Sequence, residues 1–139
     1  MRVKAHRAIS LLLLLCVGLG GCYWSRYAEV MEMHLRLLEE FSEKLQFFTD
    51  RGENVAAENW SEFVYPLERA RDFSRIAAQR FEGRPSLLAF DAALDHYGEL
   101  VASPGILATP DAAQTVAEAR ARLGESVARA REALAGESS

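Results

Sequence analysis

Residues 24–48 read WSRYAEVMEMHLRLLEEFSEKLQFF, and their spacing decides the fold. Apolar and aromatic residues recur here at alternating intervals of three and four, which places them on one face of an α-helix. This face consists of Trp24, Tyr27, Met31, His34, Leu38, Phe41, Leu45 and Phe48. Glutamates dominate the opposite face. The pattern predicts a long amphipathic helix with a coiled-coil-like stripe, in which His34 is the one polar member.

Three further stretches have the same spacing, and turn-forming residues separate them. The expected helix ends are Gly52, Gly83 and Ser103-Pro104-Gly105, and the expected helix starts are Asn54, Pro85 and Thr109. No stretch shows the period-two alternation of a β-strand. We therefore predict an all-α fold, an antiparallel up-down-up-down four-helix bundle with short connections.

Pro66 lies inside the second helical stretch. Proline removes one backbone donor and clashes with the preceding turn, so it kinks or breaks a helix. The apolar spacing continues from Phe63 to Leu67 and beyond. We therefore expect a helix that is kinked near Pro66, and a helix broken there is the alternative.

The charges are unevenly distributed along the 139 residues. The whole chain has a net charge of −4, but residues 1–21 contain three basic residues and no acidic one. The remaining 118 residues hold 13 Lys and Arg against 20 Asp and Glu, a net charge of −7. A basic start followed by an apolar run of about 14 residues is typical of a secretory signal peptide and is too short to span a bilayer.

The apolar run ends in Leu19-Gly20-Gly21-Cys22. This sequence resembles the lipobox of bacterial lipoproteins, in which a branched residue and two small residues precede a cysteine. The resemblance implies cleavage before Cys22 and lipidation of Cys22, which would anchor the chain in a bilayer. Tyr23 follows the cysteine; in many lipoproteins Asp at that place favours the inner membrane, so the resemblance implies the outer membrane, with the protein facing the periplasm.

These features predict three segments: a cleaved signal peptide (1–21), a helical bundle domain (22–135) and a disordered tail (136–139). No flexible linker follows Cys22, because the helical spacing begins at Trp24. Tyr23, Trp24 and Tyr27 are therefore expected at the membrane interface, where aromatic side chains with a polar tip are favoured. The alternative is that Trp24 and Tyr27 close the bundle core.

The mature segment has two histidines, His34 and His96, on helices that run parallel in such a bundle. They are weak candidates for a metal or haem site, and a haem- or metal-binding carrier is the alternative function. Asp91, Asp95 and Glu99 share one face of the third helix and suggest either a weak cation site or a solvated surface. The motifs of known metal and haem sites are absent, so we predict no cofactor.

The charge of −7 excludes nucleic acid as a partner, and no catalytic motif is present, so we predict no enzyme. The second helix carries Arg69, Arg71, Arg75 and Arg80. These arginines are expected to pair with the acidic first helix or, alternatively, to form a basic patch. We predict a small accessory or envelope-structural lipoprotein that binds an envelope protein through the exposed aromatics Phe47, Tyr65 and Phe73. A self-assembling homo-oligomer is another hypothesis.

Overall fold

The computed structural model describes the backbone of residues 2–138 and the side chains of residues 21–138. The elements are α1 (Arg2–Asp50), η1 (Ala57–Asn59), α2 (Ser61–Phe81), α3 (Pro85–Val101), η2 (Pro104–Ala108) and α4 (Ala112–Glu137), where η marks a short 3-10 helix. Residues 2–138 contain no β-strand. The predicted all-α class is confirmed.

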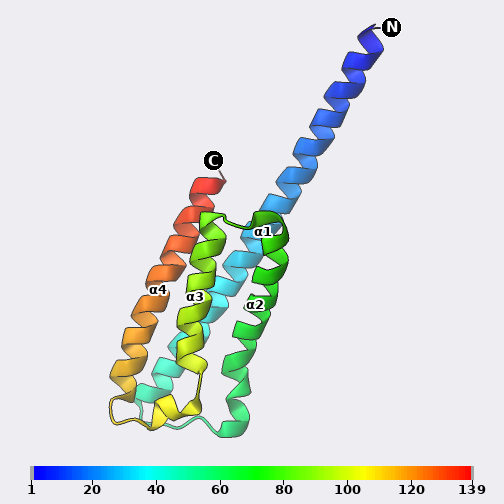
Figure 1. Cartoon of the computed structure of the whole chain (residues 1–139). Helices are drawn as coiled ribbons and strands as arrows, with labels where there is room; N and C mark the ends of the chain where they lie inside the picture. The colour runs from blue at the N-terminus through cyan, green and yellow to red at the C-terminus, as the bar shows by residue number, and fades with distance from the viewer. Residues whose placement is uncertain (1, 139) are drawn as a thin grey trace. The chain divides into compact units, whose positions relative to one another are not determined.

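The chain divides into two compact units, residues 1–30 and residues 31–139. This division falls at Val30, whereas the sequence suggested a boundary after residue 21. In the second unit the helices alternate in direction, so that α2 and α4 run opposite to α3 and to the part of α1 in this unit (Figure 1). This is the predicted antiparallel four-helix bundle.

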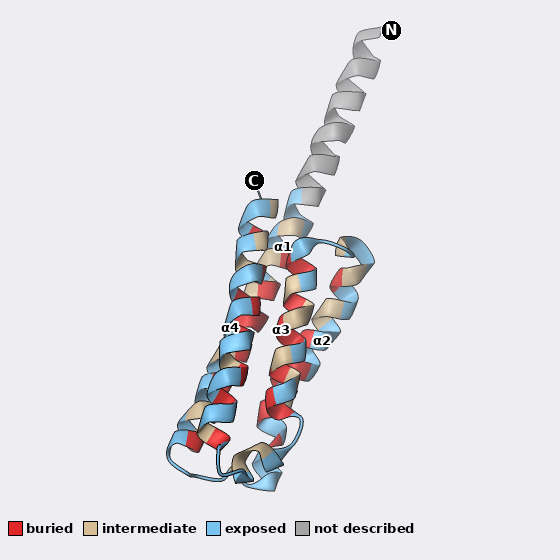
Figure 2. Ribbon diagram, turned by 60° about the vertical axis from the view of Figure 1, so that its left-hand side comes forward, coloured by how far each residue is buried: buried red, intermediate tan, exposed pale blue. Residues whose placement is uncertain are grey.

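Each helix of the bundle buries one face (Figure 2). In α1 the predicted stripe is correct: Met31, His34, Leu38 and Leu45 are buried, while Phe41 and Phe48 are half-buried. A second buried row was not predicted and consists of Leu35, Ser42 and Thr49. Because α1 contacts both α2 and α4, its buried face is wider than a two-position coiled-coil stripe.

The observed ends of the helices agree with the predicted ends better than the observed starts agree with the predicted starts. Gly52 and Gly83 follow α1 and α2 with φ of 65° and 77°, a conformation that suits glycine. The predicted cap at Asn54 is wrong, because α2 begins at Ser61 after the 3-10 turn η1. The Thr109 hydroxyl does not cap α4 either, since it donates backwards to the Ile106 carbonyl.

Helix α2 passes through Pro66 without a break. The broken-helix alternative is therefore wrong. Proline has no N–H, so the Glu62 carbonyl lacks its usual donor four residues along the helix. At the next residue, the Phe63 carbonyl accepts a hydrogen bond from the buried Tyr97 hydroxyl of α3 at 2.6 Å. This bond ties the first turns of α2 to α3.

Helix α4 extends to Glu137, so it includes part of the segment 136–139 that was predicted to be disordered. The Glu137 carboxylate accepts hydrogen bonds from the Ser86 backbone N–H at 2.9 Å and from the Ser86 hydroxyl at 2.6 Å. Ser86 is the second residue of α3, where backbone donors lack partners within the helix. Glu137 therefore caps α3 from the far end of α4, a contact that local sequence patterns do not encode.

Candidate functional sites

Cys22 is an exposed free cysteine. The side chains of residues 1–20, which include Leu19 of the lipobox resemblance, are not among those that the structure describes. Within the described residues, no helix has the length and apolar character required to cross a membrane. Lipidation of Cys22 therefore stays a prediction from the sequence.

The three aromatic residues predicted at the membrane interface differ in exposure. Tyr23 is 49% exposed, Trp24 is half-buried, and Tyr27 is only 4% exposed. The Trp24 and Tyr27 rings contact each other, with 5.2 Å between their centroids. Tyr23 retains the exposure that an interfacial role requires, whereas Tyr27 is buried.

His34 lies in an aromatic environment inside the bundle. Its ring centroid is 5.2 Å from Phe73 of α2 and 6.4 Å from Phe90 of α3. Its Nδ1 atom is buried without a hydrogen-bond partner among the described residues. Burial, with a smaller contribution from the positive charge of Arg69, lowers the pKa of His34 below its ordinary value. His34 is therefore a neutral core residue at physiological pH.

The structure does not bring His34 and His96 to one site. His34 lies beside Phe90, and His96 follows six residues later, about 9 Å further along the axis of α3 at 1.5 Å per residue. The Glu99 carboxylate of the same helix lies 4.0 Å from Nδ1 of His96. No three His, Cys, Asp or Glu side chains among residues 21–138 gather as metal ligands. No observation favours the metal or haem alternative.

The three carboxylates on α3 have separate surroundings. Asp91 accepts a hydrogen bond from the Ser74 hydroxyl of α2, and Glu99 pairs with Arg122 of α4 at 3.4 Å. Asp95 lines a groove and forms no ion pair or hydrogen bond with the described residues. These carboxylates therefore do not form a cation site.

The expected pairing of the α2 arginines with α1 is wrong for Arg69 and Arg75. Arg75 pairs with Asp72 of its own helix at 2.7 Å, and Arg69 lies over the Tyr65 ring at 5.9 Å. Two glutamates of the acidic α1 face pair instead with α4. Arg131 donates to Glu32 at 2.9 Å and to Glu39 at 2.7 Å. The signal for this contact was the seven-residue spacing of the two glutamates, which places them on one face.

Two of the three predicted partner residues are exposed. Phe47 is 52% exposed and Tyr65 is 59% exposed. Phe73 does not belong to this surface, because its ring packs between helices against His34 and Phe90, with 5.4 Å between the centroids of Phe73 and Phe90. The prediction for Phe73 failed because it lies one residue from the stripe assigned to α2, whose buried face is wider than that stripe.

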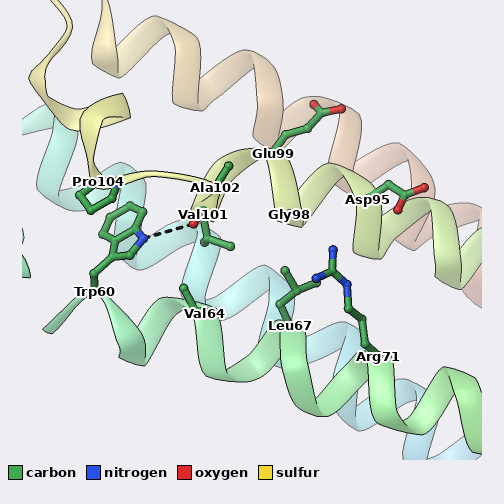
Figure 3. Close-up of a pocket in the computed structure, with 10 residues that line it drawn as sticks. All are labelled: Trp60, Val64, Leu67, Arg71, Asp95, Gly98, Glu99, Val101, Ala102 and Pro104. Atoms are coloured by element: carbon green, nitrogen blue, oxygen red, sulfur yellow. Dashed lines mark hydrogen bonds between the residues drawn. The ribbon is translucent and has the colours of Figure 1, made fainter.

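An open groove of about 620 Å³ lies between α2 and α3 (Figure 3). Its lining is apolar at one end, where the Trp60 indole N–H donates to the Val101 carbonyl at 3.2 Å. At the other end lie the Arg71 guanidinium and the Asp95 carboxylate (Figure 3). The full lining is Trp60, Val64, Leu67, Arg71, Asp95, Gly98, Glu99, Val101, Ala102 and Pro104.

Gly98 shapes the middle of this groove. A Cβ atom at residue 98 would lie 3.4 Å from Nη2 of Arg71 and 3.6 Å from Cδ2 of Leu67. An added methyl group would therefore touch both side chains at ordinary van der Waals distance. The sequence analysis did not predict this groove. The sequence feature that could have indicated it is Gly98, a glycine inside a helical stretch, together with Arg71, which lies beside the apolar stripe of the second helix.

No protein-family model, curated protein or solved structure matches this chain.

Proposed function

We propose that the protein is a small lipoprotein of the bacterial envelope, anchored through acylated Cys22 and facing the periplasm from the outer membrane. The observation that carries the anchor is Leu19-Gly20-Gly21-Cys22 after a basic and apolar leader. The exposure of Cys22 and its freedom from any disulfide agree with modification of its thiol. One acyl chain holds a protein only marginally, so two or more chains on this residue are expected.

In this proposal the bundle acts through contacts with another envelope protein, made by the α1–α2 face. Within residues 31–138, four large apolar side chains of these helices are at least 48% exposed: Met33, Phe47, Tyr65 and Ile76. The contact between His34 and Phe73 sets the register of the two helices, so Met33 and Ile76 lie at similar heights on this face. We expect these side chains to form one contiguous apolar surface, which is typical of interaction sites.

Shape also favours this face. A shallow groove of about 500 Å³ runs beside α2, and its lining includes Phe41, Val64 and Tyr65. The rim carries Glu62 and Glu68, and Lys44 of α1 pairs with Glu62 at 3.6 Å. A partner segment with aromatic or aliphatic anchors would fill the groove, and the exposed charges around it would set its orientation.

The anchor is tested by labelling the full chain with an alkyne-bearing palmitate in a Gram-negative host. We expect label on the wild type and none on Cys22→Ser. The matched control is Cys16→Ser, because Cys16 lies inside the predicted leader and its loss should leave the label unchanged. Label retained on Cys22→Ser would contradict the proposal. Tyr23→Asp should move labelled protein from outer-membrane to inner-membrane fractions on a density gradient.

The interaction face is tested by placing a photo-crosslinking amino acid at Tyr65 of the full chain in intact cells. A discrete adduct is expected there and not at Ala128, an exposed residue of α4. Ile76→Glu should remove the adduct without lowering the amount of lipidated protein. Equal crosslinking at residues 65 and 128 would contradict a specific face.

A further inference from the structure

The groove between α2 and α3 has opposite charges at one end. Arg71 and Asp95 line its two walls (Figure 3), yet neither forms an ion pair or hydrogen bond with any described residue. The third charged group of the groove, Glu99, is already paired with Arg122 at 3.4 Å. One cation and one anion therefore face the same space without partners.

The other part of the groove is apolar. Leu67, Val64 and Trp60 follow Arg71 along α2, and Val101, Ala102 and Pro104 line the opposite side. From Arg71 to Trp60 the chain covers eleven residues, about 16 Å at 1.5 Å per residue. This floor is longer than any amino-acid side chain, and its length suits an extended acyl chain.

The volume agrees with a ligand of moderate size. Pockets for small molecules are usually about 300–1,000 Å³, and this groove holds about 620 Å³. The indole N–H of Trp60 is satisfied by the Val101 carbonyl, so the ring, which is 7% exposed at the edge of the groove, contributes no unpaired donor. An apolar chain can therefore lie against Trp60 without burying a polar group.

We propose that this groove binds a single-chain zwitterionic amphiphile, a lysophospholipid with a phosphoethanolamine head. The Arg71 guanidinium donates to the phosphate, since its planar fork matches phosphate oxygens. The Asp95 carboxylate accepts from the ammonium group, and the acyl chain lies on Leu67, Val64 and Trp60. This site does not depend on whether Cys22 carries lipid.

The test uses the full chain purified in a nonionic detergent and native mass spectrometry of bound amphiphile. Three probes with the same chain length separate the charges of the head: lysophosphatidylethanolamine, lysophosphatidylglycerol, which lacks the cation, and an alkylamine, which lacks the phosphate. We expect the zwitterion to bind at least about fivefold more tightly than either other probe. Equal retention of the three probes, or no retained probe, would overturn the proposal.

Variants assign the effect to the two charges. Arg71→Met keeps an unbranched apolar stem and should weaken lysophosphatidylethanolamine binding about tenfold, the size of one charge-assisted hydrogen bond. Asp95→Asn should remove the preference for lysophosphatidylethanolamine over lysophosphatidylglycerol. The control is Arg75→Met, since Arg75 already pairs with Asp72 and does not line the groove. Unchanged binding in Arg71→Met would exclude the assigned head position.

Tryptophan emission gives an independent check of where the acyl chain lies. In a Trp24→Phe chain Trp60 is the remaining tryptophan, and its side chain is 7% exposed. A lysophosphatidylethanolamine with a brominated acyl chain should quench its emission. Emission that is not quenched at saturating probe would place the acyl chain elsewhere and overturn the assignment.

Discussion

Replacing Tyr97 by phenylalanine removes a single hydroxyl from the centre of the bundle. Tyr97 is fully buried, and its hydroxyl donates to the Phe63 carbonyl at 2.6 Å. A buried hydrogen bond of this kind contributes about 1 kcal/mol to the free energy of unfolding, and phenylalanine fills almost the same volume. We therefore expect Tyr97→Phe to lower stability at neutral pH by about 1 kcal/mol and the melting temperature by about 4 °C.

The same hydroxyl should make stability depend on alkaline pH. Burial raises the pKa of Tyr97 well above its ordinary value, while the unfolded chain ionises this group near about pH 10. Above that pH the unfolded state loses the proton first, so each further unit lowers wild-type stability by about 1.4 kcal/mol. The Tyr97→Phe chain lacks this loss. The difference of about 1 kcal/mol between the two chains should therefore vanish near about pH 11.

Urea unfolding followed by circular dichroism, at pH values from neutral to strongly alkaline, measures both effects. Tyr65→Phe is the matched control, because the Tyr65 side chain is 59% exposed and loss of its hydroxyl leaves no buried group without a partner. A constant difference between wild type and Tyr97→Phe across the alkaline range would refute the argument that burial holds the proton. No difference at neutral pH would refute the contribution of the hydrogen bond.

Three other substitutions test the interior and the charges. His34→Gln should make stability less sensitive to acid: the pKa of His34 is lowered in the fold, so the wild type loses stability below about pH 6.5 as the unfolded chain takes up the proton first, and parallel pH profiles would contradict this. Arg131→Met should cost about 1 kcal/mol at low salt and less at high salt, whereas Arg129→Met, which breaks an exposed pair with Glu125, should cost nothing measurable. Phe73→Ala should lower the free energy of unfolding in urea by about 3 kcal/mol, and Phe47→Ala should lower it by less than about 0.5 kcal/mol. Equal losses would show that Phe73 does not pack between the helices.

The parts of the fold that follow from local physics could be predicted from the sequence. The three-four spacing identified the buried face of α1, including His34, and the glycines at 52 and 83 marked helix ends through their backbone freedom. Pro85 is the first residue of α3, as its missing N–H and fixed φ suggested. Each of these features depends on residues within one or two turns.

Features that depend on which helices are neighbours could not be predicted. Periodicity gives the direction of a helix face but not the helix that covers it, so the α1 glutamates were assigned to α2 although Arg131 of α4 pairs with them. The groove was missed for the same reason, because Arg71, Asp95 and Gly98 meet only when α2 and α3 are packed. Capping of α3 by Glu137 requires the full length of α4.

These long-range contacts also have a consequence for the order of events during synthesis. Ser86 receives its cap from Glu137, 51 positions later, and Glu32 meets Arg131 after 99 positions. A chain that leaves the ribosome from its N-terminus therefore has α1 and α3 available long before their polar partners exist. Closing such large loops is entropically costly. The last turns of α4 therefore complete the bundle through Arg131 and Glu137, and a nascent chain that lacks these turns cannot form their contacts.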